Sequence, residues 1–466
     1  MLRSPWERVT ALAVTAGAVW LPFAGRPLSP DEGGLLILGS QWSEGASVYG
    51  DYFVDRPPLL IALFSLADAL GGTPWTLRLL GIVAVVATVL LAGTVGRAAG
   101  VSPVLPALTA AVLVATPLFG STVVDGELLG LPFLVGGCAA VLMAARSPRW
   151  VGWSLLAGVL AAVGGLVKQS LLDVFVLAVV LLLTRRRYAA LGTVALSALA
   201  TVAVAVLAAA WRGTTPGELW EAAVVFRRDA AAVIASSATG STESRLSGLL
   251  WALLASGAPL LAVAVVRRAR GTALLVPAVA VLAWELVAVL AGGSYWLHYL
   301  MGLVPGLVLL SAAVPGVDRL TRGAYALCAA STVIALGHVL VDPIDRPEEP
   351  PVAWLDAHAR AGDTAVVAFG GANILRETGL RSPYPDLWSL PVRVHDPDLT
   401  ALDALLSSAD RPTWIVVAGT SLATWGVEAT GADRLLAQNY TLATTTGEWT
   451  IYRSRSRDFQ RSPVVR

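Results

Sequence analysis

The chain has 466 residues, of which 56% are hydrophobic and only 14% are charged, and its mean hydropathy is +0.69. Apolar runs of about 20 residues, the length that crosses the hydrocarbon core of a bilayer, recur through its first three quarters, which excludes an ordinary soluble domain. A net charge of +1 provides no strong field for nucleic acid or another highly charged partner. We therefore expect a multi-pass α-helical membrane protein.

About eleven segments rich in Leu, Val and Ala are predicted to span the membrane. They are residues 9–25, 77–97, 103–119, 126–145, 150–167, 170–184, 188–211, 247–266, 272–291, 298–314 and 321–341. The first segment is followed by Pro22-Phe23-Ala24-Gly25-Arg26, without a small-residue cleavage site, and is predicted to be a retained anchor instead of a signal peptide. Cys138 and Cys328 lie inside distant apolar runs, so no disulfide framework is expected.

Arginines and acids alternate between successive loops. One set of loops holds Arg3, Arg8, Arg97, Arg146, Arg149, Arg185, Arg186, Arg187, Arg267, Arg268, Arg270, Arg319 and Arg322. The other set holds Asp31, Glu32, Glu44, Asp51, Asp55, Asp125, Glu127, Glu218, Glu221 and Asp229. Because positive charge is favoured on the cytoplasmic side, the arginine loops and the N-terminus are predicted to be cytoplasmic in a plasma membrane, and the C-terminal domain extracytoplasmic.

The apolar stretch from Pro57 to Leu70 is too short to span, and a crossing there would move every later arginine cluster outside. It is predicted to be a helix at the outer interface, inside a first external loop of residues 26–76. A second external loop, residues 212–246, contains a predicted surface helix over 216–231.

A charged, proline-rich linker at 342–350 marks a domain boundary. Residues 351–455 are predicted to form a small α/β domain, and 456–466 a flexible tail. The predicted elements are helices near 352–361, 399–409 and 431–438, and strands at 364–369, 413–418, 440–446 and 449–453. The sequence Gly370-Gly371-Ala372-Asn373 is no phosphate-binding fingerprint, so no nucleotide cofactor is expected.

Acids and bases gather at the predicted outer face. Asp31 and Glu32 follow the first span, where a carboxylate can accept a proton or bind a divalent metal ion such as Mg²⁺ or Mn²⁺; Asp31 can alternatively cap a helix. The metal dependence stays open. Asp51 and Asp55 precede Arg56, whose planar guanidinium suits a phosphate, although a local ion pair also explains it.

Lys168, the sole lysine, lies at the outer end of two apolar runs. A charge at membrane depth is costly and usually functional, whereas a topology anchor would sit on the cytoplasmic side. His298 and Tyr299 begin a span, where the aromatic residues can form an interfacial belt or His298 can instead donate to a phosphate. The remaining candidates are Asp125 and Glu127 in the next external loop, and Asp173 and Glu285 inside spans.

These pieces, in this order, resemble the GT-C superfamily of membrane glycosyltransferases, above all the branch of protein O-mannosyltransferases and lipid A aminoarabinose transferases. The resemblance covers about residues 1–340. It rests on Asp31-Glu32, Asp55-Arg56-Pro57-Pro58-Leu59, Trp75-Thr76-Leu77-Arg78-Leu79-Leu80, Thr116-Pro117-Leu118-Phe119 before Asp125 or Glu127, Lys168, and His298-Tyr299 before Pro305. Two departures are Arg56, where lysine is usual before the prolines, and Gly33-Gly34, where aromatics are common.

The resemblance implies an inverting glycosyltransferase that moves a sugar from a polyprenyl-phosphate donor to a glycan, lipid or protein acceptor. It implies that Asp31, with Glu32 beside it, is catalytic, and that Arg56, Lys168 and His298 contact the donor phosphate. Asp51, Asp55, Asp125, Glu127 and Tyr299 would support them. The sugar, hexose or pentose, is left open. A lipid transporter or flippase and a non-catalytic envelope protein are the alternatives.

Overall fold

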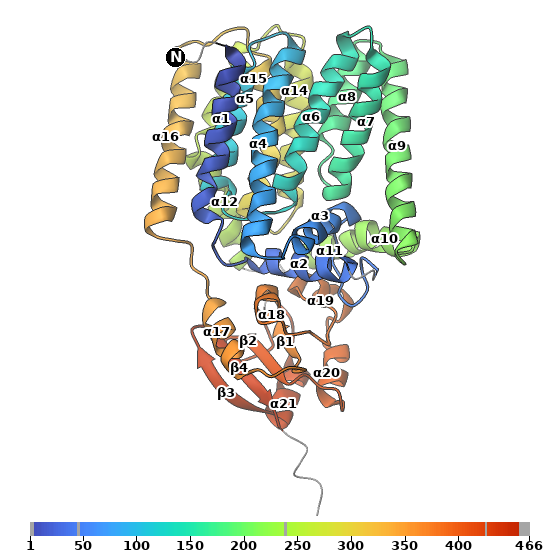
Figure 1. Ribbon diagram of the computed structural model, residues 1–466, viewed down its shortest axis with the longest axis vertical. Helices are drawn as coiled ribbons and strands as arrows, with labels where there is room; N and C mark the ends of the chain where they lie inside the picture. The colour runs from blue at the N-terminus through green and yellow to red at the C-terminus, as the bar shows by residue number, and fades with distance from the viewer. Residues whose placement is uncertain (1–3, 44–46, 237–239, 425, 456–466) are drawn as a thin grey trace, which may run out of the picture.

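A computed structural model of the chain describes all residues except 1–3, 44–46, 237–239, 425 and 456–466. The predicted tail therefore lies outside the described residues. Figure 1 shows a long helical bundle and, at one end of it, a separate C-terminal domain. The N-terminal end of the chain lies at the opposite end of the bundle (Figure 1).

The bundle contains helical structure in every segment predicted to span. The α-helices are α1 (Pro5–Val19), α4 (Pro74–Ala99), α5 (Val104–Ala115), α6 (Gly126–Arg146), α7 (Trp150–Val167), α8 (Asp173–Thr184), α9 (Tyr188–Trp211), α12 (Gly240–Ala255), α13 (Ala258–Arg268), α14 (Leu275–Ala291), α15 (Val304–Ala312) and α16 (Arg319–Val341). Short 3₁₀ turns, η1 (Leu21–Phe23), η2 (Pro117–Phe119) and η4 (Leu297–Leu303), extend three of them.

The helix lengths support fewer spans than the apolar runs predict. Among the described residues, five helices are long and apolar enough to cross a bilayer, and α12 with α13 makes a sixth, bent by 53° at the break between them. Other predicted spans are shorter helices, such as α5, α8 and α14. The structure supports a membrane protein, and the count of about eleven spans stays a prediction.

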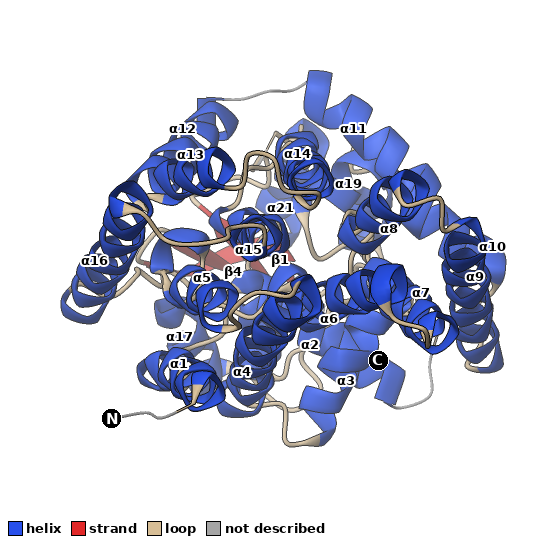
Figure 2. Cartoon of the chain, turned by 90° about the horizontal axis from the view of Figure 1, so that it is seen from above, coloured by secondary structure: helices blue, strands red, loops and turns tan. Residues whose placement is uncertain are grey.

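Local signals explain where the bundle helices begin and end. The α4 helix starts at a capping box, in which the Thr73 side chain accepts from Thr76 and Thr76 accepts from the Thr73 backbone, followed by Pro74. It ends at Gly100, whose left-handed backbone closes the last turn. Figure 2 shows α15 inside the ring of other helices, and all nine of its residues are buried.

Four α-helices lie crosswise between the bundle and the C-terminal domain (Figure 1): α2 (Pro30–Ser43), α3 (Pro58–Ala69), α10 (Pro216–Trp220) and α11 (Phe226–Ser236). A π-helical turn, η3 (Glu221–Val225), joins the last two. The predicted helix at 57–70 is therefore present as α3, whereas the loop before it holds the further helix α2. The position of α3 relative to a membrane stays a prediction.

The C-terminal domain is the expected small α/β unit. Its elements are α17 (Glu349–His358), β1 (Ala365–Ala368), α18 (Ala372–Thr378), α19 (Ser389–His395), α20 (Thr400–Ser407), β2 (Trp414–Ala418), α21 (Thr430–Asn439), β3 (Tyr440–Thr446) and β4 (Trp449–Ser454). The strand order is β1-β2-β4-β3, with β1 parallel to β2 and the other pairs antiparallel. The short helices α18 and α19, which sequence reasoning left out, face the bundle (Figure 1).

Candidate functional site

A cavity of about 340 Å³ lies where the bundle, the crosswise helices and the C-terminal domain meet. Most of the residues singled out in the sequence line it: Asp31, Asp55, Arg56, Asp125, Glu127, Lys168, His298 and Tyr299. Glu32 and Asp51 do not line it. Residues from five separate stretches of the chain are thus brought to one place.

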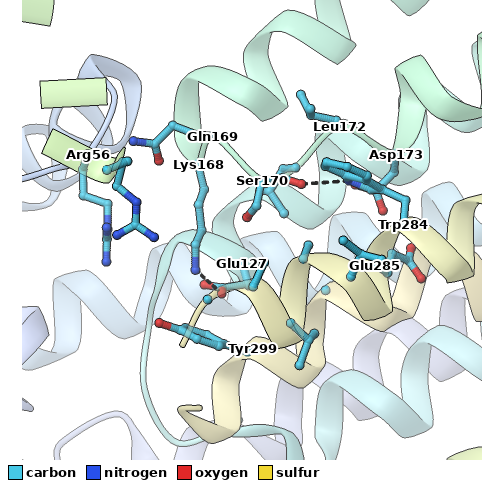
Figure 3. A pocket seen from close by; sticks show the side chains of 18 of the residues that line it. Arg56, Glu127, Lys168, Gln169, Ser170, Leu172, Asp173, Trp284, Glu285 and Tyr299 are labelled. Carbon is cyan, nitrogen blue, oxygen red and sulfur yellow. Dashed lines mark hydrogen bonds and ion pairs between the residues drawn. The ribbon is translucent and has the colours of Figure 1, made fainter. Parts of the chain in front are cut away.

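A second cavity of about 280 Å³ shares Arg56, Glu127, Lys168 and Tyr299 with the first. From these residues it continues between the link that leads into α8, up to Asp173, and the end of α14, past Trp284 (Figure 3). Its far part is mostly apolar. The two cavities therefore place charged side chains at the mouth of a space that reaches into the bundle.

Lys168 stands at this junction because α7 ends there. Its backbone is extended, and it caps the helix by donating to the Gly164 carbonyl oxygen. Its ammonium forms an ion pair with Glu127, in the first turn of α6, and its Nζ lies 4.4 Å from the centroid of the Tyr299 ring (Figure 3). The pair is largely buried, so its charges are poorly screened by water.

Arg56 is held by charge on the other side of the junction. Its guanidinium lies 2.7 Å from Asp55 Oδ1, and Arg227 of α11 lies 2.5 Å from Asp55 Oδ2. Burial raises the pKa of the Asp55 carboxyl, but Arg56 and Arg227 outweigh that effect and hold the pKa below its ordinary value. Asp55 thus stays ionised and is shared by two cations, which leaves this part of the cavity with excess positive charge.

Asp125, Glu127 and His298 form a compact group whose ligand atoms all lie within 4.8 Å of one another. Asp125 caps α6 by accepting from the Leu128 N–H at 2.8 Å through Oδ1. Its Oδ2 is buried, has no hydrogen-bond partner among the described residues, and lies 3.9 Å from His298 Nδ1. Two carboxylates and an imidazole suit a divalent transition-metal ion, and the unpartnered oxygen fits that use, although Glu127 is also engaged by Lys168.

Asp31 lies in the first turn of α2, exposed toward the cavity. Its Oδ1 accepts a hydrogen bond from Trp388 Nε1 at 2.9 Å. The cap that sequence reasoning offered as its alternative role is not among the hydrogen bonds of the described residues. Its carboxylate is therefore available to a molecule in the cavity.

Glu32, next to Asp31, points the other way and is 1% exposed. It forms a buried ion pair with Arg78 of α4, and its two oxygens also accept from the backbone N–H groups of Ser29 and Val124. This arrangement suits an anchor of α2 on the bundle better than a proton acceptor. Asp51, equally removed from the cavity, forms an exposed ion pair of 3.0 Å with Arg381 of the C-terminal domain.

Several lining residues carried no signal in the sequence. Arg227 and Arg245 come from segments that looked like polar surface, and Trp388, Ser389 and Leu390 come from the C-terminal domain. The buried acids Asp173 and Glu285 line the second cavity and interact with each other.

Comparison with known proteins identifies structures of similar fold but no protein of similar sequence. No family model and no curated protein matches the sequence. Among solved structures, the chain is similar to ArnT from Cupriavidus metallidurans bound to undecaprenyl phosphate, with 16% identity, a TM-score of 0.63, and coverage of 96% of this chain and 98% of that one.

Two more distant structures share the arrangement. The Archaeoglobus fulgidus oligosaccharyltransferase in complex with Zn and sulfate has 13% identity and a TM-score of 0.55, over 95% of this chain and 73% of that one. The mycobacterial arabinofuranosyltransferase AftD has 16% identity and a TM-score of 0.51, over 98% and 42%. The chain thus shares the fold of these solved structures, in agreement with the fold that the GT-C resemblance in its sequence implied.

Proposed function

We propose that the protein is a glycosyltransferase that moves a sugar from a polyprenyl-phosphate donor to an acceptor at the face of the membrane where the C-terminal domain lies, outside the cytoplasm. The observation that carries the proposal is the junction of two cavities: an exposed carboxylate, Asp31, lines one, and the other leads from Arg56 and Lys168 into the apolar bundle. The similar ArnT structure, which holds undecaprenyl phosphate, supports this reading.

The chemical parts of the donor, its phosphate, its isoprenoid tail and its sugar, suit different parts of the two cavities. Its phosphate would lie between Arg56 and Lys168, because an arginine fork and an ammonium both suit phosphate oxygens. Its isoprenoid tail would follow the second cavity between α8 and α14, where an apolar chain is favoured over water. Its sugar would then project into the first cavity, toward Asp31.

Asp31 would act as the base. It takes the proton of the acceptor hydroxyl while that oxygen attacks the anomeric carbon. The bond from this carbon to the phosphate oxygen breaks, its electron pair leaves with the polyprenyl phosphate, and Arg56 and Lys168 stabilise the charge that develops. Attack opposite the leaving group inverts the anomeric configuration. Asp125, Glu127 and His298 would hold a divalent cation, which would supply further positive charge beside the phosphate.

Glu32 has an anchoring role in this proposal, and His298 belongs with the acids instead of the phosphate. The test is transfer by purified protein in nanodiscs, with a panel of labelled polyprenyl-phosphate hexoses and pentoses as donors. We expect release of polyprenyl phosphate with wild type and none with Asp31→Asn. Donor binding with normal turnover in Asp31→Asn would rule out this base.

A transporter or flippase is the second candidate, favoured only by the second cavity, which reaches from the charged junction into the helical bundle. Movement of labelled polyprenyl-phosphate sugar across vesicle membranes, without loss of the sugar, would support it. A non-catalytic envelope protein predicts that Asp31→Asn leaves cellular glycans unchanged while deletion of the gene alters them.

A further inference from the structure

Trp388 brings the C-terminal domain into contact with the proposed base. Its indole N–H donates to Asp31 Oδ1 at 2.9 Å, across 357 residues of sequence. Among the described residues it is the sole hydrogen-bond donor to the Asp31 side chain. The second carboxylate oxygen is thus left for a molecule in the cavity, which Trp388 also lines.

The contact depends on two glycines in α2. A Cβ atom added at Gly34 would overlap ring carbons of Trp388, and one added at Gly33 would overlap the backbone of Asn373. Only glycine lets α18 and the indole approach α2 this closely. This gives a physical reason for Gly33-Gly34, at a place where the sequence departs from the resemblance.

Polar contacts hold the C-terminal domain in this position. Asn373 Nδ2 donates to the Leu28 carbonyl at 3.1 Å, and the Leu28 N–H donates to Glu377 Oε1 at 3.2 Å. Arg376, on the same short helix, lies 2.5 Å from Asp68 of α3. These contacts surround the start of α2, so the domain that carries Trp388 is fixed to the segment that carries Asp31.

We propose that Trp388 is a positioning residue: it orients the Asp31 carboxylate toward the acceptor hydroxyl, and the C-terminal domain is thereby part of the reaction centre. This inference rests on the proposed function of Asp31 as the base. An indole N–H suits the task because it is neutral. The neutral N–H fixes one oxygen of the Asp31 carboxylate. A cationic donor would stabilise the ionised carboxylate strongly and so make Asp31 a weaker base.

The test compares variants that differ in the N–H and little else. Trp388→Phe and Trp388→His lose nearly the same packing, but histidine keeps a ring N–H. We expect kcat about 10- to 100-fold below wild type for Trp388→Phe, because a hydrogen bond to a charged group is lost, with KM for the donor nearly unchanged. Trp388→His should recover part of kcat. The concentration of folded enzyme is taken from donor-binding titration, so that a partly unfolded variant still yields kcat per folded molecule.

Trp414→Phe is the matched control. It removes another indole hydrogen bond to a carboxylate, from Trp414 Nε1 to Asp363 at 3.0 Å, in the same domain but outside the cavity. Its kcat per folded molecule should equal that of wild type. Equal kcat for Trp388→Phe and Trp414→Phe, or for Trp388→Phe and Trp388→His, would overturn the inference.

A double variant separates this inference from the function on which it rests. Adding Trp388→Phe to Asp31→Asn should cause no further loss of any background transfer, since both changes act through one carboxylate. If Asp31→Asn is inactive and Trp388→Phe matches its control, only the positioning role fails. If Asp31→Asn retains normal turnover, the proposed base fails and the positioning role fails with it.

Discussion

Lys168 and Glu127 form an ion pair at the junction of the two cavities, with the Lys168 ammonium 4.4 Å from the centroid of the Tyr299 ring. The sole lysine of the chain is therefore paired with an acid before any donor arrives. A donor phosphate would compete with Glu127 for the ammonium, or share it.

Replacement of Lys168 by methionine should weaken donor binding. The change deletes a charged contact to a partly buried phosphate, which costs on the order of 2–4 kcal/mol, or about 30- to 1000-fold in affinity. Lys168→Arg should keep part of the affinity because it keeps the charge. The measurement is binding of a polyprenyl-phosphate sugar to protein in nanodiscs.

Lys168→Met also leaves Glu127 as a buried, unpaired charge, so a loss of stability needs its own control. Lys168→Met/Glu127→Gln removes both charges and should recover thermal stability without recovering donor affinity. If Lys168→Met binds the donor with wild-type affinity, Lys168 is only a structural partner of Glu127 and does not contact the donor phosphate.

Loss of charge at the two adjacent acids of α2 should have different effects, on stability at Glu32 and on transfer at Asp31. Glu32→Gln breaks a fully buried ion pair with Arg78 and should lower the free energy of unfolding by about 3–5 kcal/mol. Asp31→Asn, at an exposed position, should leave the melting temperature unchanged and abolish transfer. Thermal unfolding in detergent checks both. A Glu32→Gln protein with normal stability and no transfer would show that Glu32 takes part in the reaction.

Gly34→Ala should loosen the C-terminal domain. Alanine normally stabilises a helix relative to glycine by about 1 kcal/mol, so a loss here must come from the overlap of the new methyl group with Trp388. We expect faster amide hydrogen exchange in α18 and lower turnover. Gly192→Ala in α9 is the control, because a Cβ there meets nothing within 4 Å. Unchanged exchange in α18 would contradict the proposed close packing.

His395 should make the stability of the protein depend on pH. Its Nδ1 lies 3.2 Å from Asp386, and its ring packs on Phe53 and Phe226 at centroid distances of 4.5 and 5.2 Å. The hydrogen bond to Asp386 raises the pKa of His395 despite partial burial, and Glu221 adds to the rise.

Because the folded-state pKa is raised, the stabilisation is fully present below the unfolded value of about 6.5 and is lost as pH rises through the folded value. The melting temperature of wild type should therefore exceed that of His395→Gln at about pH 5.5, and the difference should shrink with rising pH. A difference that grows with pH would show that the imidazole is neutral when bound to Asp386.

The group of Asp125, Glu127 and His298 should bind a divalent ion if it is a metal site. Equilibrium dialysis with Mn²⁺ or Zn²⁺ alone tests this without relying on turnover. We expect His298→Ala to lower the affinity about tenfold or more, and His338→Ala, at a histidine of α16 outside the group, to leave it unchanged. Equal binding by both variants would place the ion elsewhere.

The sequence by itself determined where the helices of the bundle lie and that an α/β domain follows them. Both are local properties. A bilayer requires long apolar segments whose backbone hydrogen bonds are made within each helix, and helices and strands can be recognised by the different periodicities of their apolar residues. The order of charged residues at the segment ends also indicated most of the candidate site, because every second loop of the chain lies at the same end of the bundle.

The tertiary structure alone decided which candidates meet and which of them face the cavity. Asp31 and Glu32 are neighbours in the sequence, but consecutive helical residues point about 100° apart, so one faces the cavity and the other Arg78. The indole of Trp388 reaches Asp31 across 357 residues. No periodicity marks such contacts, since they depend on how whole elements pack, and packing is decided by the three-dimensional fit of distant side chains.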